Sequence, residues 1–382
     1  MHILILPSEY PTEDHKLGGI FVKEQISYLK KNHKIGVIYI YLFSIKKILK
    51  LLSNIFSRQK KLKQKYFFYW PRIPKLKYLN FLSHYFFCEI FFRRYIKNHG
   101  MPEIIHVHFS EFAGYSAYKL FKKYKIPYVI TEHSTDYLDG KIEQKYKMQS
   151  KKYLLLKKII TSASKIITVS NFLNKKVKNF FKLKENKIIT IPNTSLLIKK
   201  KNTRKVFDFI FVGTLESRKN PIQLLRVFNS LYNRGNMKLA MIGDGPLLNQ
   251  CKDFIKNKKL QKNVKIFSKL NRYQVLNLVN KSKALVSTSL HETFGIVSIE
   301  ALSLGVPIIS FNNGGVLDII NKKNGILVKD RSDLTLKKSL ELFFLNHSKF
   351  NKNEIIKFYK KKFFPRIVIN KINKVYNSVG LY

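Results

Sequence analysis

The chain has 382 residues, too many for one ordinary hydrophobic core and about the length of two α/β domains. Its 45% hydrophobic content, with no dominant low-complexity tract, excludes a fibrous or disordered protein. The 72 Lys and Arg residues against 23 Asp and Glu residues leave a formal charge of +49, which attracts nucleic acid, anionic lipid or phosphorylated substrates, although AT-rich coding would inflate Lys in the same way.

Short apolar runs alternate with helical patterns through the first half of the chain, which is typical of a parallel sheet covered by helices. We therefore expect a doubly wound first domain at residues 1–198. Its predicted strands are His2–Leu6, Ile35–Tyr41, Ile104–Val107, Tyr128–Thr131, Lys165–Val169 and Lys187–Ile191.

The same alternation begins again after the polar stretch "NTSLLIKKKNTRKV" (193–206), so we place a second doubly wound domain at 199–360. Its predicted strands are Phe207–Val212, Leu239–Ile242, Val264–Phe267, Ala284–Thr288, Pro307–Ser310 and Ile326–Val328. Ligands of such sheets bind beyond the carboxyl ends of the strands, so we expect the domains to face each other across a cleft. Residues 361–382 are predicted to hold a terminal helix, with Pro365 interrupting the helical pattern.

The segment 44–98 breaks the alternation. Ile45, Ile48, Leu49, Leu52, Ile55 and Phe56 form an amphipathic stripe flanked by lysines, and clustered aromatics follow, including the only tryptophan, Trp70. Two interpretations stay open: a helical excursion packed on the first domain, or an interfacial helix on an anionic membrane.

The two cysteines, Cys88 and Cys251, stand far apart with no Cys/His cluster, so neither a disulfide framework nor a zinc site is expected. The start "MHILILPSEYP" lacks a basic leader and reads as a buried strand. No stretch reaches the roughly 18 uncharged apolar residues that span a bilayer. We expect a cytoplasmic protein.

The stretch "LHETFGIVSIEALSLGVPII" (290–309) brings carboxylates to a helix that begins near Gly295. Glu292 lies in the loop after a strand, and Glu300 lies in the second turn of the helix. The backbone amides of Gly295, Ile296 and Val297 offer a phosphate site. Carboxylates beside that site accept hydrogen bonds from sugar or ribose hydroxyls, so we predict a sugar phosphate site here.

The filled spacing "ETFGIVSIE", continued by "ALSLGVPIIS" and "GG", resembles the signature of retaining, nucleotide-sugar-dependent glycosyltransferases of family 4. Other segments are similar to family segments in the family's order: "IIHVH" (104–108), "YVITEHS" (128–134), "ASKIITVSNFL" (163–173), "FVGTLESRKNPIQLL" (211–225) and "MIGDGPLL" (241–248). The resemblance covers most of both domains. It implies the GT-B fold, with two Rossmann-like domains and a last helix that returns to the first domain.

The resemblance also implies roles for single residues. Glu300 would bind the ribose, Glu292 would contact the donor sugar, and Lys219 would neutralise the diphosphate and stabilise the leaving group.

Gly213 directly follows the predicted strand Phe207–Val212 and matches a glycine of the family. The family usually has an arginine shortly after this glycine, but this chain has Thr214 there. Arg218, beside Lys219, is the expected replacement cation for binding the donor.

In the first half, Gly18 and Gly19 precede a predicted helix, where the backbone can approach a phosphate or make a plain turn. The Lys-x-Gly-Gly pattern is similar to that of glycogen and starch synthases, which implies that Lys16 touches the donor diphosphate.

His133 ends a predicted strand and matches a histidine that relatives place beside the donor sugar, near the reacting carbon. Without the resemblance, we would expect an ordinary hydrogen-bonded role. His106 and His108 share one face of a strand, and we expect structural packing for them, with acceptor contact as the alternative.

No Asp-x-Asp motif is placed to hold a divalent cation, and "TDYLDG" (135–140) has the wrong spacing. We therefore expect no metal and no other cofactor, because cationic side chains and helix N-termini can take the metal's role. The resemblance implies retention, with the departing phosphate acting as the base.

We expect an enzyme that moves a sugar from a nucleotide diphosphate donor to a hydroxyl of a glycan acceptor. The charge and the aromatic excursion favour a lipid-linked precursor of an envelope polysaccharide, such as lipopolysaccharide or capsule, and a peripheral position on the inner face of the plasma membrane.

Two alternatives remain. A nucleotide-sugar 2-epimerase of GT-B fold has a related architecture, but the Glu292 and Glu300 signature speaks against it. A basic nucleic-acid-binding protein would explain the charge, but lysines are spread along the chain and no nucleic-acid-binding motif is present, so we expect no nucleic acid partner.

Overall fold

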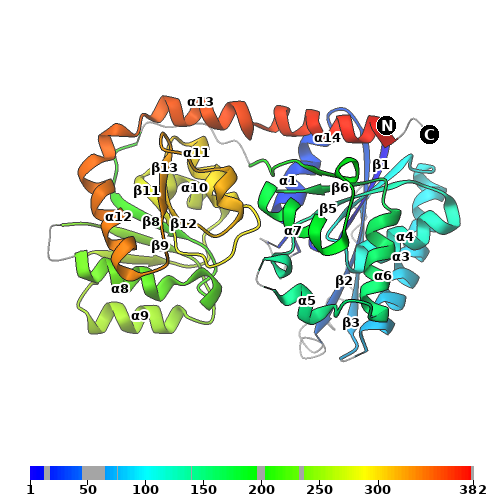
Figure 1. Ribbon diagram of the computed structural model, residues 1–382, viewed down its shortest axis with the longest axis horizontal. Helices are drawn as coiled ribbons and strands as arrows, with labels where there is room; N and C mark the ends of the chain where they lie inside the picture. The colour runs from blue at the N-terminus through cyan, green and yellow to red at the C-terminus, as the bar shows by residue number, and fades with distance from the viewer. Residues whose placement is uncertain are drawn as a thin grey trace. The chain divides into compact units, whose positions relative to one another are not determined.

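The computed structural model describes residues 1–12, 18–44, 65–74, 76–138, 140–195, 203–231 and 236–379. The chain divides into two compact units, Met1–Asn193 with Pro365–Tyr382, and Thr194–Phe364 (Figure 1). Each unit contains one parallel sheet with helices packed around it, so the predicted doubly wound α/β class is confirmed.

The amino-terminal unit has a seven-stranded parallel sheet in the order β3-β2-β1-β4-β5-β6-β7. The strands are β1 (His2–Pro7), β2 (Lys34–Ser44), β3 (Lys65–Arg72), β4 (Ile104–His108), β5 (Tyr128–Glu132), β6 (Lys165–Thr168) and β7 (Ile188–Thr190). Strand β1, "HILILP", lies between β2 and β4 and is buried at every position. A parallel strand covered on both faces requires such an unbroken apolar run, and this explains why the sequence reveals it.

Helices follow most strands of this unit, and α3, α4 and α6 lie side by side along the sheet (Figure 1). The helices are α1 (Ile20–Leu29), α3 (Lys77–His99), α4 (Phe112–Tyr124), α5 (Lys141–Lys145), α6 (Lys151–Ser162), α7 (Asn171–Phe181) and α14 (Pro365–Val379). Short 3₁₀ turns cover Thr135–Tyr137 and Glu185–Lys187. Serine side chains cap two helices: Ser150 accepts from the amide of Tyr153, and Ser170 from that of Leu173.

The segment 44–98 is not a purely helical excursion. Residues 65–72, "KYFFYWPR", form strand β3, which pairs with β2 at the edge of the sheet. Helix α3 follows it and packs against α4 and β2. The predicted stripe from Ile45 to Phe56 lies outside the described residues.

Helix α14 belongs to the amino-terminal unit although it ends the chain. Val368, Ile372 and Tyr376 lie in the same apolar core as Ile3 and Val37. Pro365 is the first residue of this helix, where its missing amide hydrogen costs nothing. The chain therefore returns to the first sheet at its end.

The carboxyl-terminal unit has a six-stranded parallel sheet in the order β10-β9-β8-β11-β12-β13. The strands are β8 (Phe207–Val212), β9 (Leu239–Ile242), β10 (Val264–Phe267), β11 (Ser282–Ser287), β12 (Ile308–Phe311) and β13 (Gly325–Val328). Phe209 and Phe228 are fully buried within its apolar core. All the strands predicted for this half of the chain are present.

The helices of this unit are α8 (Pro221–Leu231), α9 (Leu248–Asn257), α10 (Arg272–Asn280), α11 (Ile296–Ser303), α12 (Asp333–Asn346) and α13 (Lys352–Lys362). Short 3₁₀ turns cover Ser217–Lys219, Gly315–Asp318 and His347–Lys349. Asn271 and Gln274 form a capping box that fixes the start of α10. Among the residues described in either unit, no helix combines the length and apolar composition needed to cross a bilayer.

Candidate functional site

The loops after β8 and β11 bring predicted donor-binding residues together. These strands are neighbours at the centre of the sheet, and the sheet continues in opposite directions from them. Ligands of open α/β sheets bind at such a switch point, beyond the carboxyl ends of the strands. Lys219 ends the 3₁₀ turn after β8, and Glu292 lies in the loop after β11. The two residues are 73 positions apart in sequence but meet at this edge.

The ammonium of Lys219 forms an ion pair and a hydrogen bond with Oε1 of Glu292. Burial raises the pKa of the Glu292 carboxyl, but Lys219 and Arg218 together lower it by more. The net pKa therefore lies below its usual value. The amide of Glu292 donates to the carbonyl of Asn313 at 3.0 Å, and its carbonyl accepts from Gly315 at 2.8 Å. The carboxylate is therefore charged and its backbone is held on both sides.

Arg218 supplies a second cation next to Lys219. Its Nη2 atom lies 2.8 Å from Oε1 of Glu216, and about one third of each side chain is exposed. The carbonyl of Arg218 accepts from the amide of Leu290 at 2.8 Å, which ties the loop after β8 to the loop after β11. Two adjacent cations thus stand on a backbone that is braced against the Glu292 loop.

Glu300 lies in the second turn of α11, as the sequence predicts, and its side chain is only 1% exposed. Its carboxylate pairs with Nη2 of Arg272, the first residue of α10. Gly295 caps α11 with φ 98°, and no side chain caps this end among the described residues. The amides of Ile296 and Val297 therefore start a helix whose N-cap residue, a glycine, offers them no side-chain acceptor.

Gly213 follows β8 and donates its amide to the carbonyl of Ile242 at 3.0 Å. A Cβ atom at Gly213 would lie 3.6 Å from the Lys219 side chain, an ordinary contact. A Cβ atom at Gly243 would lie 1.9 Å from the carbonyl oxygen of Gly213. Glycine at 243, in the "MIGDGPLL" segment, thus allows the loop after β9 to lie directly on the loop after β8.

In the amino-terminal unit, Gly18 and Gly19 lead into α1. Gly19 has φ 60°, and a Cβ there would lie 2.3 Å from the carbonyl oxygen of Glu9, so this close approach requires glycine. Lys16 lies outside the described residues.

A cavity of about 250 Å³ lies in the amino-terminal unit, at the carboxyl ends of β1, β4 and β5. These strands surround the switch point of the first sheet, between β1 and β4. The polar lining includes Ser8, Glu9, Ser110, Glu111, Glu132 and Lys145. Carboxylates thus gather at this cavity in a chain that is otherwise poor in acids.

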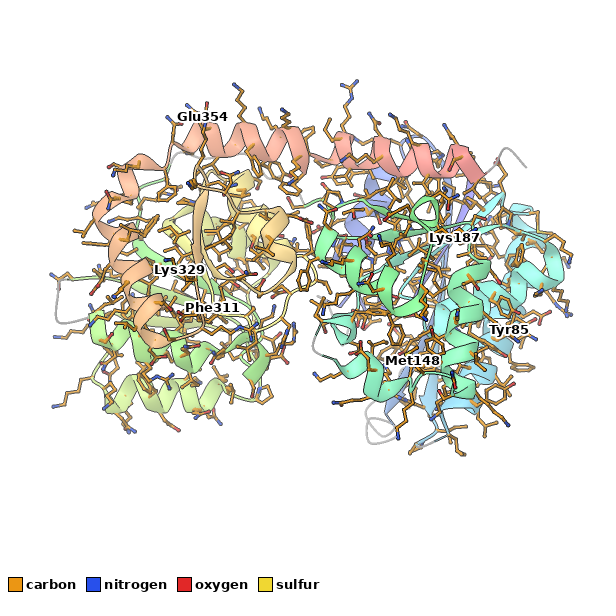
Figure 2. The ribbon with its side chains drawn as sticks, viewed as in Figure 1. Tyr85, Met148, Lys187, Phe311, Lys329 and Glu354 are labelled. Carbon is orange, nitrogen blue, oxygen red and sulfur yellow. The ribbon has the colours of Figure 1, made fainter. Side chains whose placement is uncertain are left out.

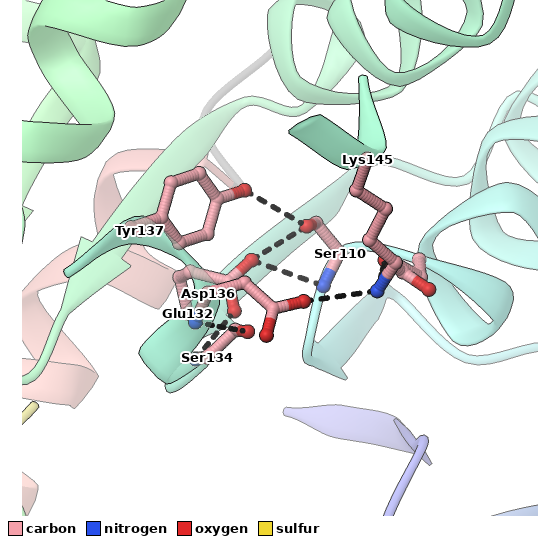
Figure 3. A network of polar contacts seen from close by, with 7 residues as sticks. Ser110, Glu132, Ser134, Asp136, Tyr137 and Lys145 are labelled. Atoms are coloured by element: carbon pink, nitrogen blue, oxygen red, sulfur yellow. Dashed lines mark hydrogen bonds and ion pairs between the residues drawn. The ribbon is translucent and has the colours of Figure 1, made fainter. Parts of the chain in front are cut away.

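The carboxylate of Glu132 joins the loop after β4 to the loop after β5 through hydrogen bonds, beside this cavity (Figure 3). Its Oε2 accepts from the amide and hydroxyl of Ser110 at 3.2 and 2.5 Å, and its Oε1 accepts from the amides of His133 and Ser134 at 2.9 and 3.0 Å. Burial raises the pKa of Glu132 above its usual value, although these donors oppose the rise. This carboxyl group therefore fixes the backbone of His133.

Lys145 of α5 lines the same cavity and pairs with two acids. Its ammonium lies 2.5 Å from Oε1 of Glu111 and 2.9 Å from Oδ2 of Asp136 (Figure 3). Burial lowers the pKa of Lys145, but the two carboxylates raise it to a net value above the usual one. The lysine is therefore a fixed cation between two anions.

The three histidines considered in the sequence analysis, His106, His108 and His133, form one buried stack. The ring centroids of His106 and His108 are 4.5 Å apart, and those of His108 and His133 are 5.3 Å apart. Nδ1 of His106 lies 2.6 Å from the hydroxyl of Tyr376, and Nε2 lies 2.7 Å from Oγ1 of Thr131.

Burial lowers the pKa of each of these histidines, to about 3 for His106 and His133. The rings are therefore neutral at physiological pH, and the stack acts through hydrogen bonds and packing.

Several residues at these sites were missed by the sequence analysis. Arg272 could have been found from its place at the start of a helix that follows a strand of the second sheet. Glu132 precedes His133 directly, but a carboxylate at a strand end gives no sign of its four donors. Tyr376 gave no signal, because its partner His106 is 270 residues away.

Two family models match consecutive parts of the chain. The model described as Glycosyltransferase Family 4 matches residues 32–194. The model described as Glycosyl transferases group 1 matches residues 194–363. An uncharacterised glycosyltransferase of Methanocaldococcus jannaschii is 25% identical over 315 residues, which cover 81% of this chain and 84% of that protein.

A Bacillus subtilis glycosyltransferase, provisionally named for teichuronic acid biosynthesis, is 27% identical over 254 residues, which cover 63% of this chain and 60% of that protein. The solved structure of sucrose-phosphate synthase from Thermosynechococcus elongatus has a TM-score of 0.74 at 16% identity, over 99% of both chains.

The structure of Anabaena HepE in complex with UDP and glucose has a TM-score of 0.69 at 14% identity, over 99% of this chain and 100% of that one. These likenesses show the GT-B fold. Since the two family models together match residues 32–363, the chain belongs to the group 1 and family 4 glycosyltransferases.

Proposed function

We propose that this protein transfers a sugar from a nucleotide diphosphate donor to a hydroxyl of a glycan acceptor, with retention at the anomeric carbon. The observation that carries the proposal is the contact between Lys219 and Glu292 at the switch point of the second sheet. A cation for a diphosphate and a charged acceptor for sugar hydroxyls stand together there.

The donor diphosphate would lie against Lys219, Arg218 and the first amides of α11, at Gly295, Ile296 and Val297. Helix N-termini and lysines both favour phosphate. Gly213 leaves the loop after β8 free of a side chain next to Lys219. From the resemblance to family members, we also propose that Lys16, Gly18 and Gly19 contact the donor diphosphate.

Glu292 would accept hydrogen bonds from the donor sugar, and Glu300 would accept them from the ribose. Glu300 is paired with Arg272 in this structure. Ribose binding would therefore require its carboxylate to share Arg272 or to exchange it for two hydroxyls.

The chemical step would not need a metal, because Lys219 and Arg218 would stabilise the charge that develops on the leaving diphosphate. Retention would follow if the departing phosphate takes the proton of the acceptor hydroxyl on the same face of the sugar. His133, whose pKa is lowered to about 3 by burial and by His106, would serve as a neutral hydrogen-bond partner of the reacting sugar.

The acceptor would be a glycan, and the carboxylates that line the cavity of the amino-terminal unit support this choice. The carboxylates of Glu9 and Glu111 suit hydroxyl groups as hydrogen-bond donors. The Bacillus subtilis relative is named for teichuronic acid biosynthesis. We propose for this chain a lipid-linked precursor of an envelope polysaccharide, at the cytoplasmic face of a membrane.

A panel of nucleotide diphosphate sugars, incubated with the purified protein with and without a chelator, tests this proposal. We expect one donor to be hydrolysed slowly on its own and to be consumed rapidly by sugar transfer when a glycan acceptor is added. The chelator should change neither rate, and Glu300→Ala should suppress both reactions. Proton NMR of the product should report the donor's own anomeric configuration. An inverted product would contradict retention, and loss of activity with the chelator would contradict a metal-independent step. A 2-epimer formed without acceptor would contradict sugar transfer.

A further inference from the structure

The outer face of helix α3 carries a row of exposed apolar side chains. Leu79, Leu82, Phe86 and Ile90 are 44%, 37%, 58% and 46% exposed. Their spacing of three or four residues places them on one face of the helix, one above the other over about 16 Å. Such a contiguous row on a soluble surface marks an interaction site.

The opposite face of α3 already supplies the packing that the fold needs. Phe81, Cys88, Phe92 and Tyr95 are at most 4% exposed, and the helix contacts α4 and β2. The outer row is thus a second apolar face of this helix, and it stays largely exposed among the described residues. Tyr85 marks this helix at the outer edge of the amino-terminal unit in Figure 2.

Basic residues continue the outer row toward the end of α3. Arg93 and Lys97 follow Ile90 at the same helical spacing, and Arg94 lies beside them; all three are exposed. The neighbouring helix α4 adds Lys119, Lys122 and Lys123.

Glu89 is the single acid of α3, and it is neutralised by Arg93 at 2.9 Å and by Lys123. The surface formed by α3 and α4 therefore joins an apolar row to a positive patch. We call this surface the α3 face.

We propose that the α3 face docks the protein on an anionic lipid surface. Leu79, Leu82, Phe86 and Ile90 enter the boundary between headgroups and acyl chains, while Arg93, Arg94 and Lys97 meet the anionic headgroups. The combination of an apolar row and a basic end complements a negatively charged interface. The inference rests on the proposed function for its lipid-linked acceptor, and it names the face that the lipid meets.

The net charge of +49 complicates any test, because the whole protein is attracted to anionic vesicles. The decisive variant must keep the charge. Phe86→Gln/Ile90→Gln removes two apolar side chains of the α3 face and changes no charge. Leu334→Gln/Leu345→Gln is the matched control, because these α12 leucines are 60% and 78% exposed in the other unit.

Cosedimentation with vesicles of phosphatidylcholine and phosphatidylglycerol, at physiological salt, measures the affinity. We expect the wild type and the α12 control to bind alike, and the α3 variant to bind at least about tenfold more weakly. Arg94→Gln/Lys97→Gln should also weaken binding, and added salt should reduce that difference because it screens headgroup charge.

Equal binding by the α3 variant and the wild type would overturn the proposal. It would also be overturned if the α3 variant changed the oligomeric state by light scattering without changing vesicle binding, since a second copy of the chain would then occupy the face. Hydrolysis of the donor in solution should be the same for all these variants. Vesicle binding without any sugar transfer would contradict the proposed function and leave the docking face intact.

Discussion

Nδ1 of His108 lies 3.1 Å from Nε2 of His133, so the histidine proposed to contact the donor sugar is held from behind by a second buried histidine. One ring must donate and the other accept, which links the tautomers of the two. The ring of His106 stacks on His108 and is hydrogen-bonded to the hydroxyl of Tyr376 in α14. The last helix of the chain therefore contacts the same stack that holds His133.

His108 is a positioning residue in this account. His108→Ala should lower kcat about tenfold with little change in KM, because the His133 ring loses its partner while the groups that bind the donor stay in place. His108→Asn, whose amide can still reach His133, should recover part of the loss. A change confined to KM, or no rescue by asparagine, would contradict a positioning role.

Lys219→Ala should lower kcat/KM for the donor at least about 100-fold, because it removes a cation from the developing charge of the leaving group. Lys283 offers a matched control. It is ion-paired with Asp208 at 2.8 Å in the same sheet, at the starts of β11 and β8, the edge opposite Lys219. Steady-state kinetics of Lys219→Ala and Lys283→Ala should differ by this factor, and equal losses would mean that charge alone matters.

The pair of Arg272 and Glu300 should show strong coupling in a double-mutant cycle. Arg272→Gln leaves a buried carboxylate without its cation and should cost about 2–3 kcal/mol of unfolding free energy, below the figure for fully buried pairs because Arg272 is 21% exposed. Adding Glu300→Gln should recover most of that loss. Urea unfolding followed by circular dichroism measures the unfolding free energy of the wild type, the two single variants and the double variant. Additive losses in the two single variants would contradict the pairing.

His84 should make the amino-terminal unit sensitive to acid. Burial lowers its pKa from 6.5 to about 3, and its Nδ1 lies 2.7 Å from the hydroxyl of Ser116. Between these pH values the unfolded chain binds a proton that the folded protein does not, so the unfolding free energy falls as the pH drops below 6.5.

His84→Gln should therefore reduce the stability lost between pH 7 and pH 5 by about 2 kcal/mol. The fluorescence of Trp70, the only tryptophan, reports unfolding of this unit. The remaining buried histidines keep part of the pH dependence. An unchanged pH slope would show that His84 is protonated in the folded protein.

Most of the fold could be predicted because central parallel strands are unbroken apolar runs. "HILILP" is an example, and "FDFIFV" is apolar except for Asp208 at its second position. Strand β3 was missed because "KYFFYWPR" is aromatic and begins with lysine, unlike the apolar runs of the buried strands. It lies at the edge of the sheet, where its residues are only partly buried. The sequence could not show that its partner would be β2.

The site was only partly predictable for a related reason. Glu292 and Lys219 follow strands, so both could be assigned to the carboxyl edge of a sheet, but their contact depends on β8 and β11 being neighbours. Local patterns do not fix strand order. Arg272 and Tyr376 were missed because each acts through a partner from a distant segment, with no motif around it.

The central claim is that the carboxyl-terminal unit holds a nucleoside diphosphate with its ribose at Glu300. Calorimetric titration of a panel of nucleoside diphosphates into the wild-type protein and Glu300→Gln tests this directly. We predict that one base binds tightly to the wild type and at least about tenfold more weakly to the variant, because a charged acceptor of two hydroxyls becomes neutral. No binding by any member of the panel, or the same Kd for both proteins, would contradict the account.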